Sequence, residues 1–183
     1  MDERYLYKVS LVGPSGVGKT TIQKRIVTNK FIQAVESTVG VTFESKKYKV
    51  GNRVVELQIW DFGGQTRFKD ISDLLIKGSD AVLLVYDVSR PVTLDELKNI
   101  WIPLTLKNVS SDTILVLDGN KVDLGKRVTD SEIKEVLKKG RIPYYFETSA
   151  KTGYGINEVF IEIVKKLATR KGRKVLKYKM WAT

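Results

Sequence analysis

The sequence predicts an α/β protein in which helices cover a largely parallel sheet. Continuous apolar runs at residues 81–86, 114–117 and 144–146 are typical of parallel strands that are buried on both faces. Helical patterns separate these runs, and the chain opens with a strand pattern that stops at a glycine-rich turn. Strands that alternate with helices indicate a layered α/β fold, in which ligands bind beyond the carboxyl ends of the strands.

The first part of the chain predicts a strand, a loop, a helix and a hairpin. Residues 8–12 form the strand pattern, and a helical segment covers residues 19–29. Two extended runs, residues 39–50 and 53–60, are joined at Gly51 and Asn52. Because apolar and polar side chains alternate in the second run, we expect a half-exposed antiparallel hairpin.

Helices are predicted between the later strands, at residues 93–108, 130–139 and 154–170. Pro103 interrupts the first of them, so we expect a kink or a break there. The last is the clearest, because its apolar residues recur at helical spacing on one face: Ile156, Val159, Phe160, Ile163, Val164 and Leu167.

Composition limits the chemistry that is available. The 183 residues suit one domain, and they include neither Cys nor His. Disulfides, thiolate and imidazole metal sites, Cys nucleophiles and Ser-His pairs are therefore excluded. No apolar run approaches the roughly 18 to 20 residues that span a bilayer, and the charged start is unlike a signal peptide, so the expected compartment is the cytoplasm.

Positive charge is concentrated at the C-terminal end. The net charge is +11, and eight of these eleven excess charges lie in residues 164–183, which contain no acidic residue. We therefore divide the chain into a domain, residues 1–170, and a basic tail, residues 171–183. Two interpretations of the tail stay open: weak, salt-sensitive contact with an anionic membrane, or a helix end followed by a solvated disordered segment. A nucleic-acid partner is not expected.

The first chemical signal is the sequence GPSGVGKT at residues 13–20, a full match to the P-loop pattern. Its glycines let successive backbone N–H groups point toward phosphate oxygens. Lys19 adds a charge for the β and γ phosphates, and the Thr20 hydroxyl can bind Mg²⁺. The pattern follows a strand and opens a helix, which favours a functional loop over an ordinary tight turn. The predicted phosphate-binding residues are Ser15, Gly16, Val17, Gly18, Lys19, Thr20 and Thr21.

Other motifs follow later strands. Asp61 ends the hairpin and is placed to hold the Mg²⁺ shell through a water, with Gly64 and Gln65 next in the chain. The sequences NKVD at residues 120–123 and TSAK at residues 148–151 follow two of the apolar strands. The N1–H and N2–H₂ groups of guanine are adjacent donors that one carboxylate can accept together, so Asp123 is suited to guanine and not to adenine.

Together these motifs resemble the Ras superfamily of small GTPases, nearest to the Rab and Ras branches, over about residues 5–170. The first switch loop supplies the remaining motif, where Thr38 stands 19 residues after Lys19; Thr42 competes for this role but should lie inside the strand. Phe31, twelve residues after Lys19, matches the aromatic residue that packs near the guanine and ribose, although a core aromatic is the alternative.

The resemblance implies a three-layer P-loop GTPase fold: a six-stranded mixed sheet with one antiparallel strand and about five helices. It also implies slow hydrolysis of GTP with Mg²⁺, in which Gln65 orients the attacking water and Lys19, Thr38 and Gly64 serve the γ-phosphate. Metal ligands would be Thr20, Thr38 and, through water, Asp61. Guanine would be held by Phe31, Asn120, Lys121, Asp123, Ser149, Ala150 and Lys151. Expected partners are effectors, an activating protein and an exchange factor, and the expected state is a monomer.

The sequence departs from the family pattern in three places. Residues 61–66 read DFGGQT, and Gly63-Gly64 resembles the Arf branch. Val35 replaces an aromatic residue that often covers the phosphates. The C-terminal residues contain no Cys and no Gly follows Met1, so we expect no lipidation and only peripheral membrane contact through the tail.

Three other classes of protein share part of these features. A P-loop small-molecule kinase has no use for NKVD and TSAK at successive strand ends. A nucleotide-stabilised interaction module that does not hydrolyse GTP stays open, although Gln65 and Thr38 favour turnover. A nucleic-acid-binding protein is suggested by charge alone.

Overall fold

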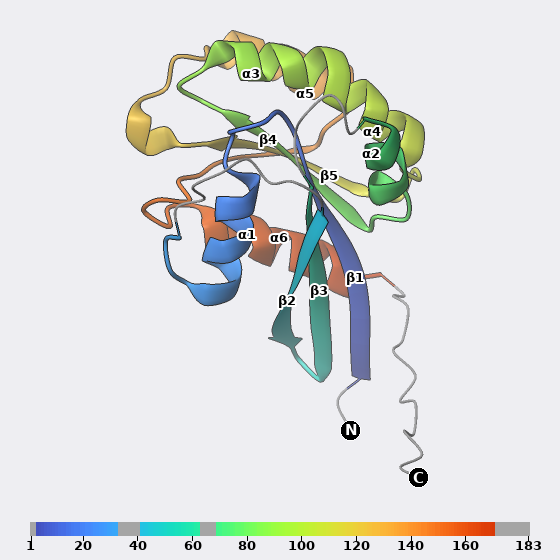
Figure 1. The fold of residues 1–183 in the computed structure, drawn as a ribbon. Helices are drawn as coiled ribbons and strands as arrows, with labels where there is room; N and C mark the ends of the chain where they lie inside the picture. Colours follow the sequence, from blue (N-terminus) through green and yellow to red (C-terminus); the bar gives the residue numbers. More distant parts are fainter. Residues whose placement is uncertain (1–2, 33–40, 63–68, 171–183) are drawn as a thin grey trace.

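The computed structural model describes residues 3–32, 41–62 and 69–170 (Figure 1). Its six strands form one sheet in the order β2-β3-β1-β4-β5-β6. The strands are β1 (Glu3–Val12), β2 (Val41–Val50), β3 (Arg53–Phe62), β4 (Ala81–Asp87), β5 (Ile114–Asn120) and β6 (Tyr144–Glu147). The helices are α1 (Lys19–Thr28), α2 (Lys69–Ile76), α3 (Pro91–Glu96), α4 (Ile102–Asn108), α5 (Asp130–Gly140) and α6 (Ile156–Ala168). A π-helical segment, Leu97–Trp101, joins α3 to α4, and Val122–Leu124 form a 3₁₀ turn.

The sheet is mixed in the predicted way. Strand β2 pairs with β3 in the antiparallel sense, and every other neighbouring pair is parallel. Helices α1 and α6 cover one face, while α2, α3, α4 and α5 cover the other (Figure 1). The predicted three-layer α/β fold with one antiparallel strand is confirmed.

Two apolar clusters hold the helices to the sheet. One joins β1, β3, β4 and β5 to α1 and α6, and the other joins β4 and β5 to the four helices on the opposite face. All seven residues of β4 and all seven of β5 are buried, as their continuous apolar runs predict. Strand β6 differs, because all four of its residues are only half-buried. The expectation that this run is buried on both faces is wrong, since β6 pairs with β5 alone and forms an edge of the sheet.

The hairpin β2–β3 turns at Gly51 and Asn52, as expected. Val55, Leu57 and Ile59 are fully buried, whereas the polar residues between them are half-buried. The alternation in the sequence therefore reports the two faces of β3 correctly.

The helical region around Pro103 is continuous but irregular. The π-helical segment Leu97–Trp101 ends directly before Ile102, whose backbone N–H donates to the carbonyl of Leu97. Pro103 stands in the first turn of α4, a position that needs no backbone N–H. The expected kink thus takes the form of a wide turn, which aims the fully buried Trp101 into the core.

Helix α2 lies outside the segments predicted from periodicity. It spans eight residues, so the pattern repeats over little more than two turns. Ile76 at its end is fully buried against the cluster that contains Trp101. None of the helices within the described residues is long and apolar enough to cross a membrane.

Helix α6 allows a matched test of the core. The six apolar residues that its periodicity singles out are all buried, and Ile163 is fully so, while Ile161 is 42% exposed. We expect Ile163→Ala to lower the free energy of unfolding by about 2 to 5 kcal/mol, because it leaves a cavity between α6 and the sheet. Ile161→Ala is the control and should cost less than about 1 kcal/mol. Denaturant unfolding at one fixed nucleotide concentration measures both, and equal losses would contradict the assignment of the buried face.

Candidate functional site

The loops that carry the motifs lie at one edge of the sheet. Strands β1, β3, β4, β5 and β6 all run in the same direction, so their carboxyl ends share this edge. The P-loop follows β1, Asp61 stands near the end of β3, and the two guanine motifs follow β5 and β6. Segments more than a hundred residues apart in the sequence therefore meet here, as expected for a parallel α/β sheet.

Two glycines allow the P-loop to fit between strands. Gly13 has φ +149°, and a Cβ there would collide with the backbone carbonyl of Val85 on β4. Gly18 has φ +103°, and a Cβ there would collide with the side-chain nitrogen of Asn120. Both positions combine a left-handed backbone with a close approach, which only glycine tolerates without strain.

Lys19 opens α1 from a buried position. Its side chain is 5% exposed, and Nζ donates to the carbonyls of Gly13 and Pro14 at 2.8 Å each. Burial lowers the pKa of Lys19 to about 8, against the opposing effect of nearby carboxylates, chiefly Asp61. A desolvated ammonium group beside several backbone amides is suited to bind an anion.

Thr20 and Asp61 bring a hydroxyl and a carboxylate together. The Thr20 hydroxyl donates to Oδ2 of the fully buried Asp61, which connects the first turn of α1 to the end of β3. Hydroxyl and carboxylate oxygens are ligands that Mg²⁺ prefers. Among the described residues no group of three or more acidic side chains gathers, so these residues alone do not form a complete metal cage.

The motif after β5 contacts the P-loop directly. Nδ2 of the buried Asn120 donates to the carbonyl of Val17 at 2.8 Å, and Nζ of Lys121 donates to the carbonyl of Gly16 at 2.6 Å. Lys121 has a left-handed backbone with φ +68°, which starts the 3₁₀ turn that contains Asp123. These two bonds join the P-loop to the NKVD motif.

The motif after β6 completes the arrangement. Ser149 Oγ donates to Oδ1 of Asp123 at 2.5 Å, and the backbone N–H of Ala150 donates to Oδ1 of Asn120 at 3.1 Å. Ser149 and Ala150 are buried, while Lys151 is exposed. The structure therefore brings together Asn120, Asp123, Ser149 and Ala150, whereas Lys121 bonds to the P-loop and the side chain of Lys151 is exposed.

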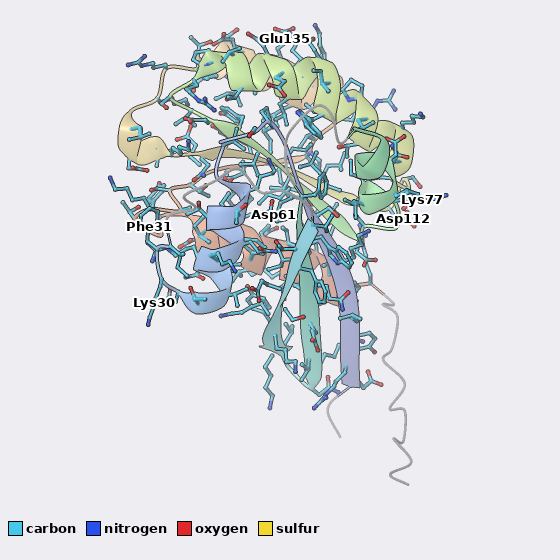
Figure 2. The ribbon with its side chains drawn as sticks, in the orientation of Figure 1. Lys30, Phe31, Asp61, Lys77, Asp112 and Glu135 are labelled. Carbon is cyan, nitrogen blue, oxygen red and sulfur yellow. The ribbon has the colours of Figure 1, made fainter. Side chains whose placement is uncertain are left out.

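Some predicted residues lie elsewhere. Thr38, Gly64 and Gln65 lie outside the described residues. Phe31 follows α1 and is 42% exposed, at the periphery of the molecule in Figure 2, whereas Asp61 lies inside it. Thr42 lies within β2, as expected of a strand residue, and its hydroxyl donates to Oε1 of the buried Gln23 at 3.2 Å.

A buried carboxylate that the motifs did not indicate is linked to the P-loop through two cationic side chains. Asp87, at the end of β4, is 1% exposed and binds Lys121 Nζ at 2.9 Å and Arg90 Nε at 3.2 Å. Arg90 Nη2 lies 3.4 Å from the carbonyl of Ser15. Burial opposes the ionisation of Asp87, but hydrogen bonds from Lys121 and Ser89 outweigh it and lower its pKa. The two cations held by Asp87 thus reach consecutive P-loop carbonyls.

Arg25 was also missed, because nothing in its local sequence indicates its partners. From α1 its guanidinium donates to the carbonyls of Ala150 at 2.9 Å and Asn29 at 3.1 Å, and also to that of Lys151. A fork of five N–H donors is suited to join several carbonyls in this way. Arg25 therefore ties the segment before Phe31 to the loop after β6.

Comparison with known proteins agrees with this geometry. The family model described as the Ras family matches residues 8–169. The chain belongs to the Ras family. Ras-related protein Rab-1 of Theileria parva is 34% identical over 89% of this chain and 74% of its own length. Putative ras-related protein Rab-5B of Dictyostelium discoideum is 38% identical over 88% of this chain and 75% of its own length. Ras-related protein Rab7 of Glycine max is 38% identical, with corresponding shares of 88% and 82%.

The resemblance inferred from the motifs is therefore confirmed. This Ras-family protein is a Rab-like small GTPase, a switch that binds guanine nucleotide and hydrolyses GTP. Membership of this family sets aside the alternative of a P-loop small-molecule kinase.

The contacts of Arg25 lead to a test of how this GTPase retains its nucleotide. We expect Arg25→Ala to speed the release of bound GDP on the order of tenfold, because the loop after β6 loses its bonds to α1. Arg53→Ala is the control, since Arg53 donates to the carbonyl of Ala168 at 2.7 Å, away from the motif loops. Release of a fluorescent GDP analogue in stopped flow measures both rates. An unchanged rate of GDP release in Arg25→Ala would show that Arg25 does not help to retain the nucleotide.

Proposed function

We propose that the loops at the carboxyl edge of the sheet bind guanine nucleotide with Mg²⁺ and divide the work of GTP hydrolysis among named residues. One observation carries the proposal: hydrogen bonds link the P-loop, the NKVD motif and the TSAK motif into a single structure. Bonds between segments so distant in sequence have a clear use if one ligand touches all of them.

The phosphates are assigned to the P-loop. Backbone amides of residues 15–21 surround the phosphate oxygens at the start of α1, where the helix dipole also favours negative charge. Lys19 supplies a positive charge, and a polyphosphate would replace the carbonyls of Gly13 and Pro14 as its partner. The buried position of Lys19 strengthens that interaction, because water screens it little.

The base is assigned to Asp123, with Asn120, Lys121 and the loop after β6 around it. Ser149 donates to one oxygen of Asp123, which fixes the orientation of the carboxylate. The oxygens of the Asp123 carboxylate can then accept hydrogen bonds from the two adjacent donors of guanine. Phe31 and Lys151 complete the proposed set.

The residues present fit a magnesium ion. Thr20 and Asp61 offer a hydroxyl and a carboxylate oxygen that contact each other. Thr20 would bind the ion directly and Asp61 would bind it through a water. Thr38 would add a second hydroxyl when GTP is bound. When bound, Mg²⁺ neutralises charge on the β and γ phosphates.

Hydrolysis is assigned to an in-line attack of water on the γ-phosphorus. Gln65 orients this water, whose oxygen bonds to the γ-phosphorus as the bond from the γ-phosphorus to the bridging oxygen breaks. The protons of the water leave with the inorganic phosphate, and Lys19 stabilises the charge that develops on the bridging oxygen. Thr38 and Gly64 contact the γ-phosphate, so its loss releases both switch loops. Effectors, an activating protein and an exchange factor would read these loops, and the basic tail would add weak contact with anionic lipids.

Base recognition is tested by Asp123→Asn. The substitution places an NH₂ group opposite a guanine donor, so GDP affinity should fall by two or more orders of magnitude, from losses of roughly 1 to 3 kcal/mol per bond. Xanthine complements the amide through its N1–H and C2 oxygen, so the variant should gain relative preference for xanthosine nucleotides. Competition titrations with GTP, XTP and ATP measure these preferences.

The matched control is Asp112→Asn, which makes the same change at an exposed residue in the turn before β5. It should bind GTP as the wild type does. A wild type that binds ATP as well as GTP would overturn the assignment of the base site.

The catalytic role of Gln65 is tested by Gln65→Leu. Leucine cannot orient water, so the rate of phosphate release in a single turnover should fall by about tenfold or more while GTP still binds. Gln58→Leu, on the half-buried face of β3, is the control and should hydrolyse GTP at the wild-type rate. Equal phosphate release from Gln65→Leu and the wild type would show that Gln65 does not serve the attacking water.

A further inference from the structure

The proposed function leaves one buried carboxylate without a role. Asp118 lies on β5, two residues before Asn120, and is fully buried. Its neighbours in the sheet register are Val85 on β4 and Phe146 on β6. Burying an ionised carboxylate is costly unless it is well paired, and the described residues offer Oδ1 of Asp118 no hydrogen-bond partner. A residue of this type in such a place calls for a specific explanation.

The other oxygen of Asp118 belongs to a hydrogen-bond chain that ends at the P-loop. Thr148 Oγ1 lies 3.0 Å from Oδ2 of Asp118 and 3.3 Å from Oδ1 of Asn120. Asn120 in turn donates from Nδ2 to the carbonyl of Val17. The hydroxyl of Thr148 carries one proton, so it can donate well to only one of its two acceptors at a time.

We propose that Asp118 is a positioning residue for guanine-nucleotide binding, and that its proton decides whether the Thr148 hydroxyl donates to Asn120 or to Asp118. The inference rests on the proposed function of Asn120 in the nucleotide site. It adds a residue that acts on the nucleotide site indirectly, through the side chains of Thr148 and Asn120.

The two protonation states produce different bonds. With Asp118 protonated, its hydroxyl donates to Thr148 Oγ1, and the Thr148 hydroxyl is free to donate to Oδ1 of Asn120. With Asp118 ionised, its carboxylate accepts the hydrogen bond that the Thr148 hydroxyl donates. Oδ1 of Asn120 then keeps only the bond from the Ala150 N–H. The amide of Asn120, and through it Val17, is therefore held more firmly in the protonated state.

The change between these states falls near neutral pH. Burial raises the pKa of Asp118 to about 7, and the hydrogen bond from Thr148 opposes this rise. Nucleotide should consequently be held longest below pH 7 and released faster as pH rises through 7.

The environment of Asp118 includes other ionisable groups on the neighbouring elements. On the elements packed against it they are Tyr86 and Asp87 on β4; Tyr144, Tyr145 and Glu147 on β6; Lys19, Lys24 and Arg25 on α1; and Glu158, Glu162, Lys165 and Lys166 on α6. Asp87 and Glu147 are each paired with a lysine, Lys19 binds P-loop carbonyls, and Glu158 is exposed. Burial chiefly raises the pKa of Tyr86, to which Asp118 adds the smallest part, and the Tyr86 hydroxyl bonds to that of Tyr145. No charged partner for Asp118 occurs within the part of the chain that is described.

The experiment measures the release of mant-GDP from the Mg²⁺-loaded full chain between pH 6.0 and 8.5, chased with unlabelled GDP. We expect the wild-type rate to rise about three- to tenfold over this range, the equivalent of one lost hydrogen bond. Asp118→Asn cannot titrate and should lack this step. Thr148→Val should release nucleotide fast at every pH, whereas Thr148→Ser keeps the hydroxyl and should keep the step. Asp80→Asn is the control, because Asp80 accepts from the Lys8 N–H at the far end of the sheet, and it should show the wild-type step.

A second measurement does not depend on any variant. In wild-type protein labelled with ¹³C at aspartate carboxyls, with GDP bound, the Asp118 signal should titrate with a midpoint within about one unit of 7. A signal that does not titrate between pH 5 and 9 would overturn the inference, as would an equal pH step in Asp118→Asn and the wild type. A wild type that binds no mant-GDP at pH 6 would overturn the proposed function as well, so the two failures are distinct.

Discussion

The amide of Asn120 is the interaction on which the site depends. It donates to the Val17 carbonyl on one side and accepts from the Ala150 N–H on the other, so a single buried side chain joins the loops after β1, β5 and β6. This junction is possible because the strands run parallel and end at one edge. It also explains Gly18, since any larger residue there would displace the amide. The P-loop and the two loops proposed to recognise the base therefore share one support, although their residues lie far apart in the chain.

The polar network around this junction is stabilised mainly by the sheet beneath it. A buried polar network adds specificity when every group in it has a hydrogen-bond partner, and it lowers stability when one group lacks a partner. Strands β4 and β5 are buried along their whole length, so the apolar clusters on both faces supply the stability that such a site requires. The polar residues then gather at the carboxyl ends, where Asp87 and Asn120 face each other across β4 and β5.

The sequence predicted the parts of this structure that local pattern determines. Continuous apolar runs give β4 and β5, helical periodicity gives the buried face of α6, and residue type with spacing gives the P-loop, Asp123 and Ser149. It did not reveal α2, which is too short for a clear pattern, or the partial exposure of β6, which depends on that strand lying at an edge. Arg25 and Asp87 escaped for a related reason: their partners lie on other elements, and no local signal marks a side chain whose contacts are set by topology.

Asp87 and Asp118 show how position within one sheet separates two residues of the same type. Both are buried carboxylates near the ends of neighbouring strands, two residues apart in register, because Asp87 pairs with Asn120 and Asp118 with Val85. Lys121 and Arg90 lie beside Asp87, so its charge is matched and its pKa falls. Among the described residues only the Thr148 hydroxyl reaches Asp118, so burial prevails and the pKa of Asp118 rises. Environments that separate the pKa values of two like groups assign them different tasks. At neutral pH Asp87 is a fixed anion that anchors the cations behind the P-loop, while Asp118 is the member of the pair that can still change its charge and, with it, the bonds of Asn120.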